Sequence, residues 1–394
     1  MTVSNYMHGH LGNGGATRPL VSLIECRNYH PDSLDAALDR SIELLGGIEK
    51  FVRPGQKVFL KPNLLLAANP ERAATTHPLF VAAAVRLVQR AGALPFFGDL
   101  PGGFHVGTTK KIYRVTGMDA AAEQTGATLV KLEAHGFRKH LIPDAKIITE
   151  VHVPKFLDDV DVIINLPKPK THMQSKYTGA VKNLFGFVTT ADRVLAHKNL
   201  RLADFSTALA EIFSIFRPAL TLMDAVTGME GAGPSQGAPV RLGFIAASRD
   251  AVALDAIVTS LLGYAPKEVL TTRAAAAMRL GSADLSSIRV VGDPPASFRK
   301  NIKKPPPHVT LAAGLLSDLA NRLTDVRPVI RQKKCEKCGT CAAVCPVQAI
   351  SSRPDFLIDP DACIRCFCCH EVCPHSAIEL KEAPLARLAK RMRS

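Results

Sequence analysis

The chain has 394 residues, of which 47% are hydrophobic and 21% charged, as in an ordinary globular protein with a large core. This length leaves room for one large domain and one small domain. No apolar run reaches the roughly 18 uncharged residues needed to span a bilayer, and residues 1–19 are rich in Gly, Asn and His, without the apolar stretch of a secretory signal. We therefore expect no membrane span and a flexible N-terminal tail over residues 1–19.

The net charge of +14 is concentrated in two segments. Residues 299–334 contain nine basic and two acidic residues, and residues 381–394 contain five basic residues and one acidic residue. Neither an RNA-binding aromatic signature nor a helix-turn-helix pattern accompanies this charge. A basic linker and a basic tail that docks an anionic partner are therefore expected, rather than a nucleic-acid-binding surface.

From Leu20 onward, short β-branched runs alternate with helical patterns. Strands are expected at 21–26, 57–60, 94–98, 128–132, 147–153, 161–166, 219–223 and 240–246. Helices are expected at 33–51, 76–90, 118–125, 202–216 and 250–262, with Thr76 as a candidate cap of the second. This alternation predicts an α/β domain over residues 20–298, with a doubly wound, mainly parallel sheet in three layers.

Polar side chains follow the carboxyl ends of several expected strands. In doubly wound sheets the ligand crevice lies beyond these strand ends, so the polar side chains there are expected to meet on one rim. They are Lys61, Asn63, Asp99, Lys168, Lys170, His172, Asp224 and Asp250.

After residue 298 the pattern changes to a Pro-rich, basic linker over 299–330, whose apolar stretch 311–323 predicts a helix packing between two domains. A ferredoxin-like α+β unit is expected over 331–380, followed by the basic tail 381–394. This unit holds two runs of Cys-x2-Cys-x2-Cys-x3-Cys-Pro, the pattern that binds two 4Fe–4S clusters, in which the fourth cysteine of each run crosses to the other cluster. The first predicted cluster has ligands Cys335, Cys338, Cys341 and Cys373, and the second has Cys363, Cys366, Cys369 and Cys345.

Structural zinc and disulfides are the alternatives for these cysteines, but a zinc site needs only two Cys-x2-Cys pairs and no third or fourth cysteine in each run. Clusters of this type need reduced thiolates, which predicts a cytoplasmic protein. Cys26 and Cys368 are left over. Cys26 is expected to be a small buried residue, and Cys368 to fill space or to tune the adjacent cluster.

The segment 168–186 is the densest candidate site outside the cysteine runs. It holds Lys168, Lys170, Lys176 and Lys182 together with His172, with Gly179 and Gly186 as expected tight-turn positions. Four ammonium groups near one strand end suit a carboxylate or phosphate ligand. The alternative is a solvated basic loop, although the Pro-Lys-Pro sequence at its start fixes the backbone.

A second candidate is the segment 223–237, where Gly and Pro residues surround Asp224 and Glu230. We expect a flexible loop that approaches a ligand closely or, equally, a plain surface loop. It is not a nucleotide-binding P-loop, because no Gly-Lys-Ser/Thr follows.

These motifs carry a family resemblance. Val-Phe-Leu-Lys-Pro-Asn at 58–63, the segment 167–186, Met-Asp-Ala-Val-Thr-Gly-Met-Glu-Gly at 223–231 and Ser-Arg-Asp-Ala-Val-Ala-Leu-Asp-Ala at 248–256 resemble the domain-of-unknown-function family 362. Members of this family often carry a C-terminal ferredoxin module, so the resemblance covers roughly residues 20–380. The family implies no particular reaction.

A more distant resemblance is to the nickel-pincer lactate racemase. In that enzyme a histidine precedes a lysine with nine residues between them, in a glycine-containing loop, and His172 and Lys182 are similar in spacing. Ala180 stands where the racemase has the second glycine of a pair. The resemblance implies a related fold and a site at this loop.

These patterns favour an iron–sulfur oxidoreductase of unidentified substrate, in which two 4Fe–4S clusters exchange electrons with an anionic small molecule in the α/β crevice. The expected catalytic residues are His172, as proton donor or metal ligand, and Lys182. The expected substrate-binding residues are Lys61, Asn63, Lys168, Lys170, Asn183, Asp224 and Glu230. The expected partners are an electron-donor or electron-acceptor protein and the small molecule, with no nucleic acid.

Two alternatives stay open. One is an electron carrier or adaptor that docks on a partner enzyme and does no chemistry itself. The other is a racemase-like enzyme with an additional metal or organometallic cofactor at His172, Lys182 and His197.

Overall fold

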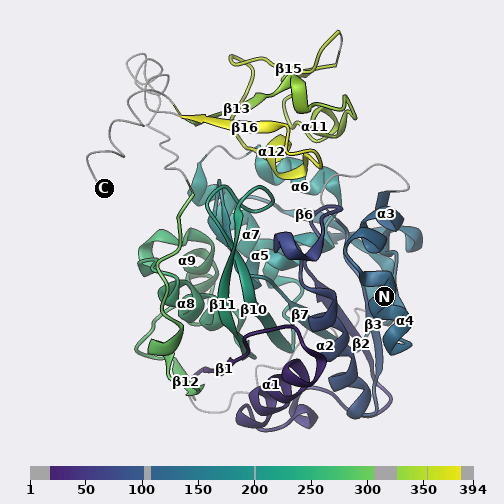
Figure 1. Cartoon of the computed structure of the whole chain (residues 1–394), viewed down its shortest axis with the longest axis vertical. Helices are drawn as coiled ribbons and strands as arrows, with labels where there is room; N and C mark the ends of the chain where they lie inside the picture. The colour runs from purple at the N-terminus through teal and green to yellow at the C-terminus, as the bar shows by residue number, and fades with distance from the viewer. Residues whose placement is uncertain (1–17, 102–107, 199–200, 306–325, 353, 383–394) are drawn as a thin grey trace.

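The computed structural model describes residues 18–101, 108–198, 201–305, 326–352 and 354–382 (Figure 1). Most of the tail predicted over residues 1–19, the helix predicted at 311–323 and nearly all of the basic tail at 381–394 lie outside the described residues.

The large domain is built on one mixed sheet with the strand order β12-β1-β11-β10-β7-β2-β3-β4. The strands on this path are β1 (Leu20–Glu25), β2 (Lys57–Pro62), β3 (Leu94–Phe97), β4 (Thr128–Leu129), β7 (Val162–Leu166), β10 (Leu220–Glu230), β11 (Ala238–Ser248) and β12 (Arg289–Gly292). The short strands β8 (Lys170–His172) and β9 (Lys176–Thr178) form a hairpin attached to β10. All strand pairs on the main path are parallel except those that β11 makes with β1 and β10.

Helices cover both faces of this sheet (Figure 1). The helices are α1 (Pro31–Leu44), α2 (Pro78–Arg90), α3 (Thr108–Val115), α4 (Met118–Thr125), α5 (Ala180–Asn183), α6 (Thr190–His197), α7 (Leu202–Ser214), α8 (Ala251–Leu261) and α9 (Leu270–Ala277). Alternation along each strand divides the core into two layers: Phe59 joins the layer under α7 and α8, whereas Val58 and Leu60 join the layer under α1 and α2. The three-layer, mainly parallel α/β fold predicted from the sequence is thereby confirmed.

Several element boundaries differ from those predicted. The first helix ends at Leu44 rather than 51, because Gly46 and Gly47 adopt φ angles of 96° and 93° that no helix can contain. The side chain of His77, not that of Thr76, caps α2. The extended segment near 147–153 becomes β6 (Glu150–Pro154), which pairs with β5 (Phe137–Leu141) outside the main sheet.

The largest difference concerns residues 223–237. Strand β10 continues to Glu230 and pairs antiparallel with β11 up to this last residue, so that only a short loop remains between them. Asp224 therefore lies inside a strand, with its side chain fully buried, and the expected long flexible loop does not exist.

A small C-terminal unit, called here the cluster module, sits at one end of the sheet with α12 over α6 (Figure 1). Its elements are β13 (Val326–Ile330), α11 (Thr340–Ala343), β14 (Ile350–Ser351), β15 (Leu357–Ile358), α12 (Cys368–Val372) and β16 (Ile378–Glu382). Because β13 pairs with β16, residues 326–330 belong to this unit rather than to the preceding linker. Within the described part of the chain, no helix has the length and apolar character required to cross a membrane.

Candidate functional site

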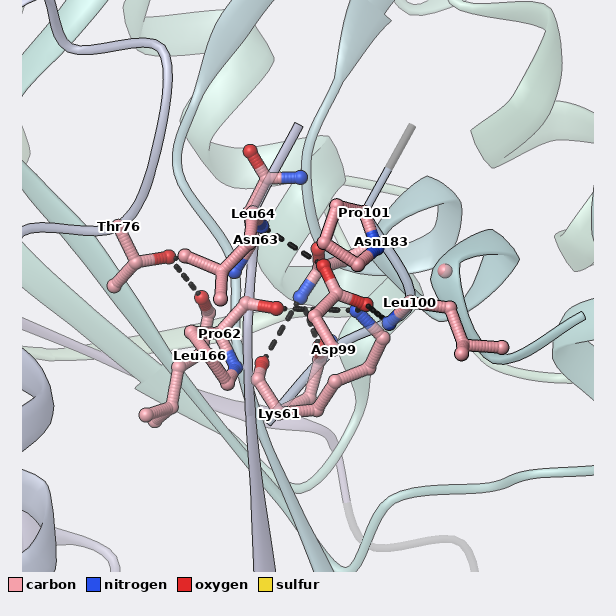
Figure 2. Close-up of polar contacts among 12 residues, drawn as sticks. Lys61, Pro62, Asn63, Leu64, Thr76, Asp99, Leu100, Pro101, Leu166 and Asn183 are labelled. Carbon is pink, nitrogen blue, oxygen red and sulfur yellow. Dashed lines mark hydrogen bonds and ion pairs between the residues drawn. The ribbon is translucent and has the colours of Figure 1, made fainter. Parts of the chain in front are cut away.

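The first predicted binding lysine, Lys61, forms a buried ion pair. It lies near the end of β2, and its Nζ is 2.6 Å from Oδ1 of Asp99, with both side chains almost fully buried (Figure 2). Asp99 also accepts hydrogen bonds from the backbone N–H groups of Leu64 and Leu100. Burial lowers the pKa of Lys61, and the neighbouring Asp99 opposes that shift. A buried lysine that is already paired with a carboxylate serves mainly to hold the structure together, and it is a less suitable group for binding a ligand.

A second buried pair joins Lys168 to Asp224 across 2.8 Å. The Asp224 carboxylate accepts two further hydrogen bonds, from the Tyr29 hydroxyl at 2.9 Å and the His77 backbone N–H at 2.9 Å. The Tyr29 ring stacks on the His77 ring with their centroids 3.7 Å apart. This pair ties the loops after β1, β2 and β7 to the middle of β10.

The His77 imidazole should make stability depend on pH. Burial lowers the pKa of His77 to about 4, whereas the unfolded chain takes up this proton near pH 6.5. The contribution of the neutral His77 ring to the free energy of unfolding is therefore fully present above pH 6.5. It is lost as the pH falls through 4, at up to about 1.4 kcal/mol per pH unit. Anaerobic urea unfolding of the wild type and of His77→Gln between pH 4.5 and 6.5 should give a flatter curve for the variant. Parallel curves would contradict this assignment.

Lys170 and Lys182 differ from the first two lysines, because no carboxylate oxygen within the described residues lies within 4.0 Å of either Nζ. Lys170 is buried in β8 and donates to the Asn63 side-chain oxygen at 2.6 Å and the Ala74 carbonyl at 2.7 Å. Burial lowers the pKa of Lys170 well below its usual value, and the charges of Lys182 and Lys168 lower it further. Lys182 is partly buried in α5, with its Nζ 5.5 Å from the Phe185 ring centroid.

The imidazole of His172 is fully buried in β8, and its Nδ1 is held by the backbone. Nδ1 accepts the backbone N–H groups of Gln174 and Ser175, each at 3.1 Å. The proton of the neutral ring therefore sits on Nε2, and burial lowers the pKa of His172 to about 4. Metal binding through Nε2 would require moving this proton to Nδ1, where two N–H donors already point, so this arrangement disfavours His172 as a metal ligand.

Nε2 of His172 faces a carboxylate from the cluster module. Oε1 of Glu371, in α12, lies 3.0 Å from it, and the Glu371 side chain is 8% exposed. The two atoms are not aligned for a hydrogen bond. Burial opposes ionisation of Glu371, but His172, Lys182 and His197 favour it more strongly, and the pKa of Glu371 falls below its usual range. The α/β site is thus completed by an acid from the other unit.

The two glycines of the 168–186 segment are needed for close approach rather than for a turn. Neither Gly179 nor Gly186 has a left-handed φ angle. A Cβ on Gly186 would lie 2.4 Å from Oδ1 of Asp99 and 2.6 Å from Nζ of Lys61. A Cβ on Gly179 would lie 2.2 Å from Oδ1 of Asp255, whose carboxylate accepts the first N–H groups of α5. The tight-turn prediction for these glycines is therefore wrong.

The other predicted binding residues separate into two groups. Asn63 belongs to the site, because it holds Lys170. Asn183 supports the neighbouring backbone by donating to the Lys61 carbonyl (Figure 2). It also donates to the Asn165 side chain. Glu230 is turned to the start of the linker, where it accepts the backbone N–H of Lys303 at 2.9 Å. The structure therefore does not bring Glu230 into the site.

In the cluster module, nine cysteines line two separate cavities. One cavity is lined by Cys335, Cys338, Cys341 and Cys373, and the other by Cys345, Cys363, Cys366 and Cys369 together with Cys368. These are the two crossed ligand sets expected from the spacing. The backbone N–H groups of Ala349 and Ala377 each donate to the sulfur of a crossing cysteine, Cys345 and Cys373, at 3.2 Å. Thiols gathered around a cavity, with N–H groups on the sulfurs, fit the demands of iron–sulfur clusters.

The two cysteine runs differ at four positions that were not predicted as functional residues. Gly339, Thr340, Ala342 and Ala343 of the first run correspond to Phe367, Cys368, His370 and Glu371 of the second. Phe367 packs on Met173 of the α/β domain, and the His370 carbonyl accepts from the Gln236 side chain at 2.7 Å. The second run therefore carries the docking residues. In the sequence these positions are marked by Phe, His and Glu where the first run has Gly, Ala and Ala.

Comparison with known proteins is consistent with this division. Residues 58–260 match the family described as Domain of unknown function (DUF362), and residues 327–379 match the 4Fe-4S dicluster domain. The second match supports an iron–sulfur electron-transfer role. A thylakoid-associated protein of Synechocystis sp. is 36% identical over 263 residues, which cover 66% of this chain and 79% of that protein.

Among solved structures, the lactate racemase apoprotein from Thermoanaerobacterium thermosaccharolyticum matches with a TM-score of 0.34 and 12% identity, over 60% of this chain and 55% of that chain. The family match alone spans half of the sequence, and the cyanobacterial relative is similar over most of its own length. The chain belongs to the family of proteins with the domain of unknown function DUF362, here joined to a 4Fe–4S dicluster domain.

Proposed function

We propose that this protein is an iron–sulfur oxidoreductase that exchanges electrons with a small anionic molecule in the α/β crevice. In this proposal two 4Fe–4S clusters are bound, one by each cysteine set. The first set is Cys335, Cys338, Cys341 and Cys373, and the second is Cys363, Cys366, Cys369 and Cys345. The clusters supply single electrons, and the α/β domain binds and orients the substrate.

The contact between Glu371 and His172 carries this proposal. Glu371 lies two residues from Cys369 and two from Cys373, so a cluster bound to Cys369 would sit next to the α/β site. The other set opens toward solvent, because Cys338 is exposed whereas Cys366 and Cys369 are buried. This difference in exposure favours the entry of electrons from a partner protein near Cys338. The electrons would then be delivered to the substrate from the buried second set. The reduced thiols of both sets suit the cytoplasm.

Lys170 and Lys182 are the proposed anion-binding groups, because Lys61 and Lys168 already have carboxylate partners. Lys182 and His172 remain the residues proposed to act on the substrate. In a site shielded from water, a fixed ammonium group stabilises developing negative charge strongly. Nε2 of His172, which carries the proton, faces the Glu371 carboxylate at 3.0 Å.

Replacement of Lys182 by Met should impair turnover without loss of the clusters. Anaerobically purified protein, reduced with dithionite, is mixed with a panel of small carboxylates and phosphorylated metabolites, and reoxidation is followed by cluster absorbance. We expect Lys182→Met to slow reoxidation by about 10²–10³-fold, the usual loss for one electrostatic group. Lys176→Met, in the same segment and also partly buried, is the matched control and should behave as the wild type.

Unchanged reoxidation in Lys182→Met would show that this assignment is wrong. Reoxidation by a partner protein, with no response to any small molecule, would favour the electron-carrier alternative.

A further inference from the structure

The carboxylate of Glu371 enters a group of basic side chains that all come from the α/β domain. His172 contributes Nε2 at 3.0 Å, and Glu371 also interacts electrostatically with Lys182, His197 and Lys170. Lys182 and His197 gather around the Phe185 ring, the Nζ of Lys182 lying 5.5 Å from its centroid and the two rings lying 5.6 Å apart. One acid from the cluster module thus meets several basic groups.

The basic side chains around Glu371 could make more hydrogen bonds and ion pairs than they make with Glu371. Oε1 of Glu371 has no aligned hydrogen bond, although a buried carboxylate is normally held by several donors. Lys170 and Lys182 have no carboxylate partner within 4.0 Å among the described residues. His197 is 5% exposed, and its Nδ1–H donates to the Arg193 carbonyl at 2.7 Å. Its Nε2 is therefore an acceptor in the neutral ring, and it has no hydrogen-bond partner among the described residues. Cations and a polar nitrogen that remain available at one buried spot indicate a missing ligand.

The cluster module does not depend on Glu371 for its docking. Phe367 is buried against Met173 and Val326, and it keeps a left-handed φ of 60° where the first cysteine run has Gly339 at 76°. A non-glycine residue in this conformation is strained, and tight packing must offset that strain. The His370 carbonyl is held by Gln236 at 2.7 Å, and the His370 Nε2 lies 3.3 Å from the Ala232 carbonyl. These contacts hold α12 in place without the Glu371 side chain.

We propose that the donor groups of His172, Lys170 and Lys182 form a binding site for a small carboxylate, and that the carboxylate of Glu371 occupies this site in the absence of that ligand. An arriving carboxylate takes the place of the Glu371 side chain, makes the ammonium contacts that Glu371 leaves unmade, and lies beside the second cysteine set. This inference rests on the proposed function and narrows its anionic substrate to a carboxylate. Because ligand and Glu371 compete, removing the charge of Glu371 must tighten binding.

The test is isothermal titration calorimetry of the full-length, cluster-loaded protein under anaerobic conditions, with sodium oxalate as the probe. Relative to the wild type, Glu371→Gln should bind oxalate at least tenfold more tightly. Glu371→Asp keeps the charge but is one methylene shorter, so it should show an intermediate affinity. Glu336→Gln removes an exposed glutamate of the same module and should bind as the wild type does. Cluster absorbance and the unfolding midpoint verify that each variant is intact.

Equal or weaker oxalate binding by both Glu371 variants would overturn the displacement of Glu371 while leaving an anion site at Lys182 in place. Tighter binding of inorganic phosphate than of oxalate would overturn the carboxylate class. Absence of oxalate and phosphate binding in all four proteins would overturn this inference together with the anionic substrate of the proposed function.

Discussion

Replacement of Asp224 by Asn should lower the free energy of unfolding by about 3–5 kcal/mol, because it leaves the buried ammonium group of Lys168 without its counter-charge. Asp224 is fully buried and accepts from Lys168, Tyr29 and the His77 backbone, so an amide in its place loses acceptors as well as charge. Equilibrium urea unfolding at neutral pH, followed by far-ultraviolet circular dichroism under anaerobic conditions, measures the change.

Two controls separate the charge effect from packing. The double variant Lys168→Met/Asp224→Leu removes both charges and should recover most of the lost stability, because a buried ion pair can be replaced by apolar side chains at little net cost. Glu150→Gln breaks the exposed pair between Lys139 and Glu150 and should change stability by less than about 1 kcal/mol. A similar loss in the Asp224 and Glu150 variants would contradict the importance of burial.

Replacement of Cys369 by Ala should remove one of the two proposed clusters, whereas replacement of the adjacent Cys368 should retain both. Cys369 is the third cysteine of the second run and lines the cavity shared with Cys345, Cys363 and Cys366. Loss of one thiolate from a four-cysteine set leaves an iron without its protein ligand. We expect Cys369→Ala to contain about half of the iron and acid-labile sulfide of the wild type, with correspondingly reduced cluster absorbance.

Cys368→Ala is the matched control, since the two thiols are neighbours in α12 and both are buried. Cys368 lies outside the Cys-x2-Cys-x2-Cys spacing, so its removal should leave iron and sulfide contents unchanged. Half-loss of iron in Cys368→Ala, with full retention in Cys369→Ala, would reverse the ligand assignment.

The parts of the site that the sequence predicted best are those set by local spacing. The two cysteine runs specified two crossed sets of four, and the structure gathers each set around its own cavity, because the short intervals within a run leave the chain little freedom. The strand ends were also predictable, since an apolar run such as Val162–Leu166 is stable only as a central strand whose two faces are both covered. The segment 168–186 could accordingly be placed at the rim.

The pairing of charged side chains was not predictable, because it depends on contacts between residues far apart in the chain. Four lysines that look alike in the sequence have different partners in the structure. Lys61 and Lys168 are paired with Asp99 and Asp224, whereas Lys170 and Lys182 have no carboxylate within 4.0 Å among the described residues. The reading of 223–237 as a loop was wrong for a related reason. Glycine and proline favour turns locally, but antiparallel pairing with β11 extends β10 to Glu230.

The sequence by itself determined the α/β fold class, the two cysteine sets and the neighbourhood of the basic segment, because periodicity and close spacing act within a few residues. Only the tertiary structure decided that the cluster module lies over the rim of the sheet and that Glu371 of the second cysteine run meets His172 across 3.0 Å. Those two residues are 199 positions apart, and no local pattern specifies such a contact. It arises from the packing of two units, in which the burial of Phe367 and the hydrogen bonds of His370 bring a carboxylate to a group of basic side chains.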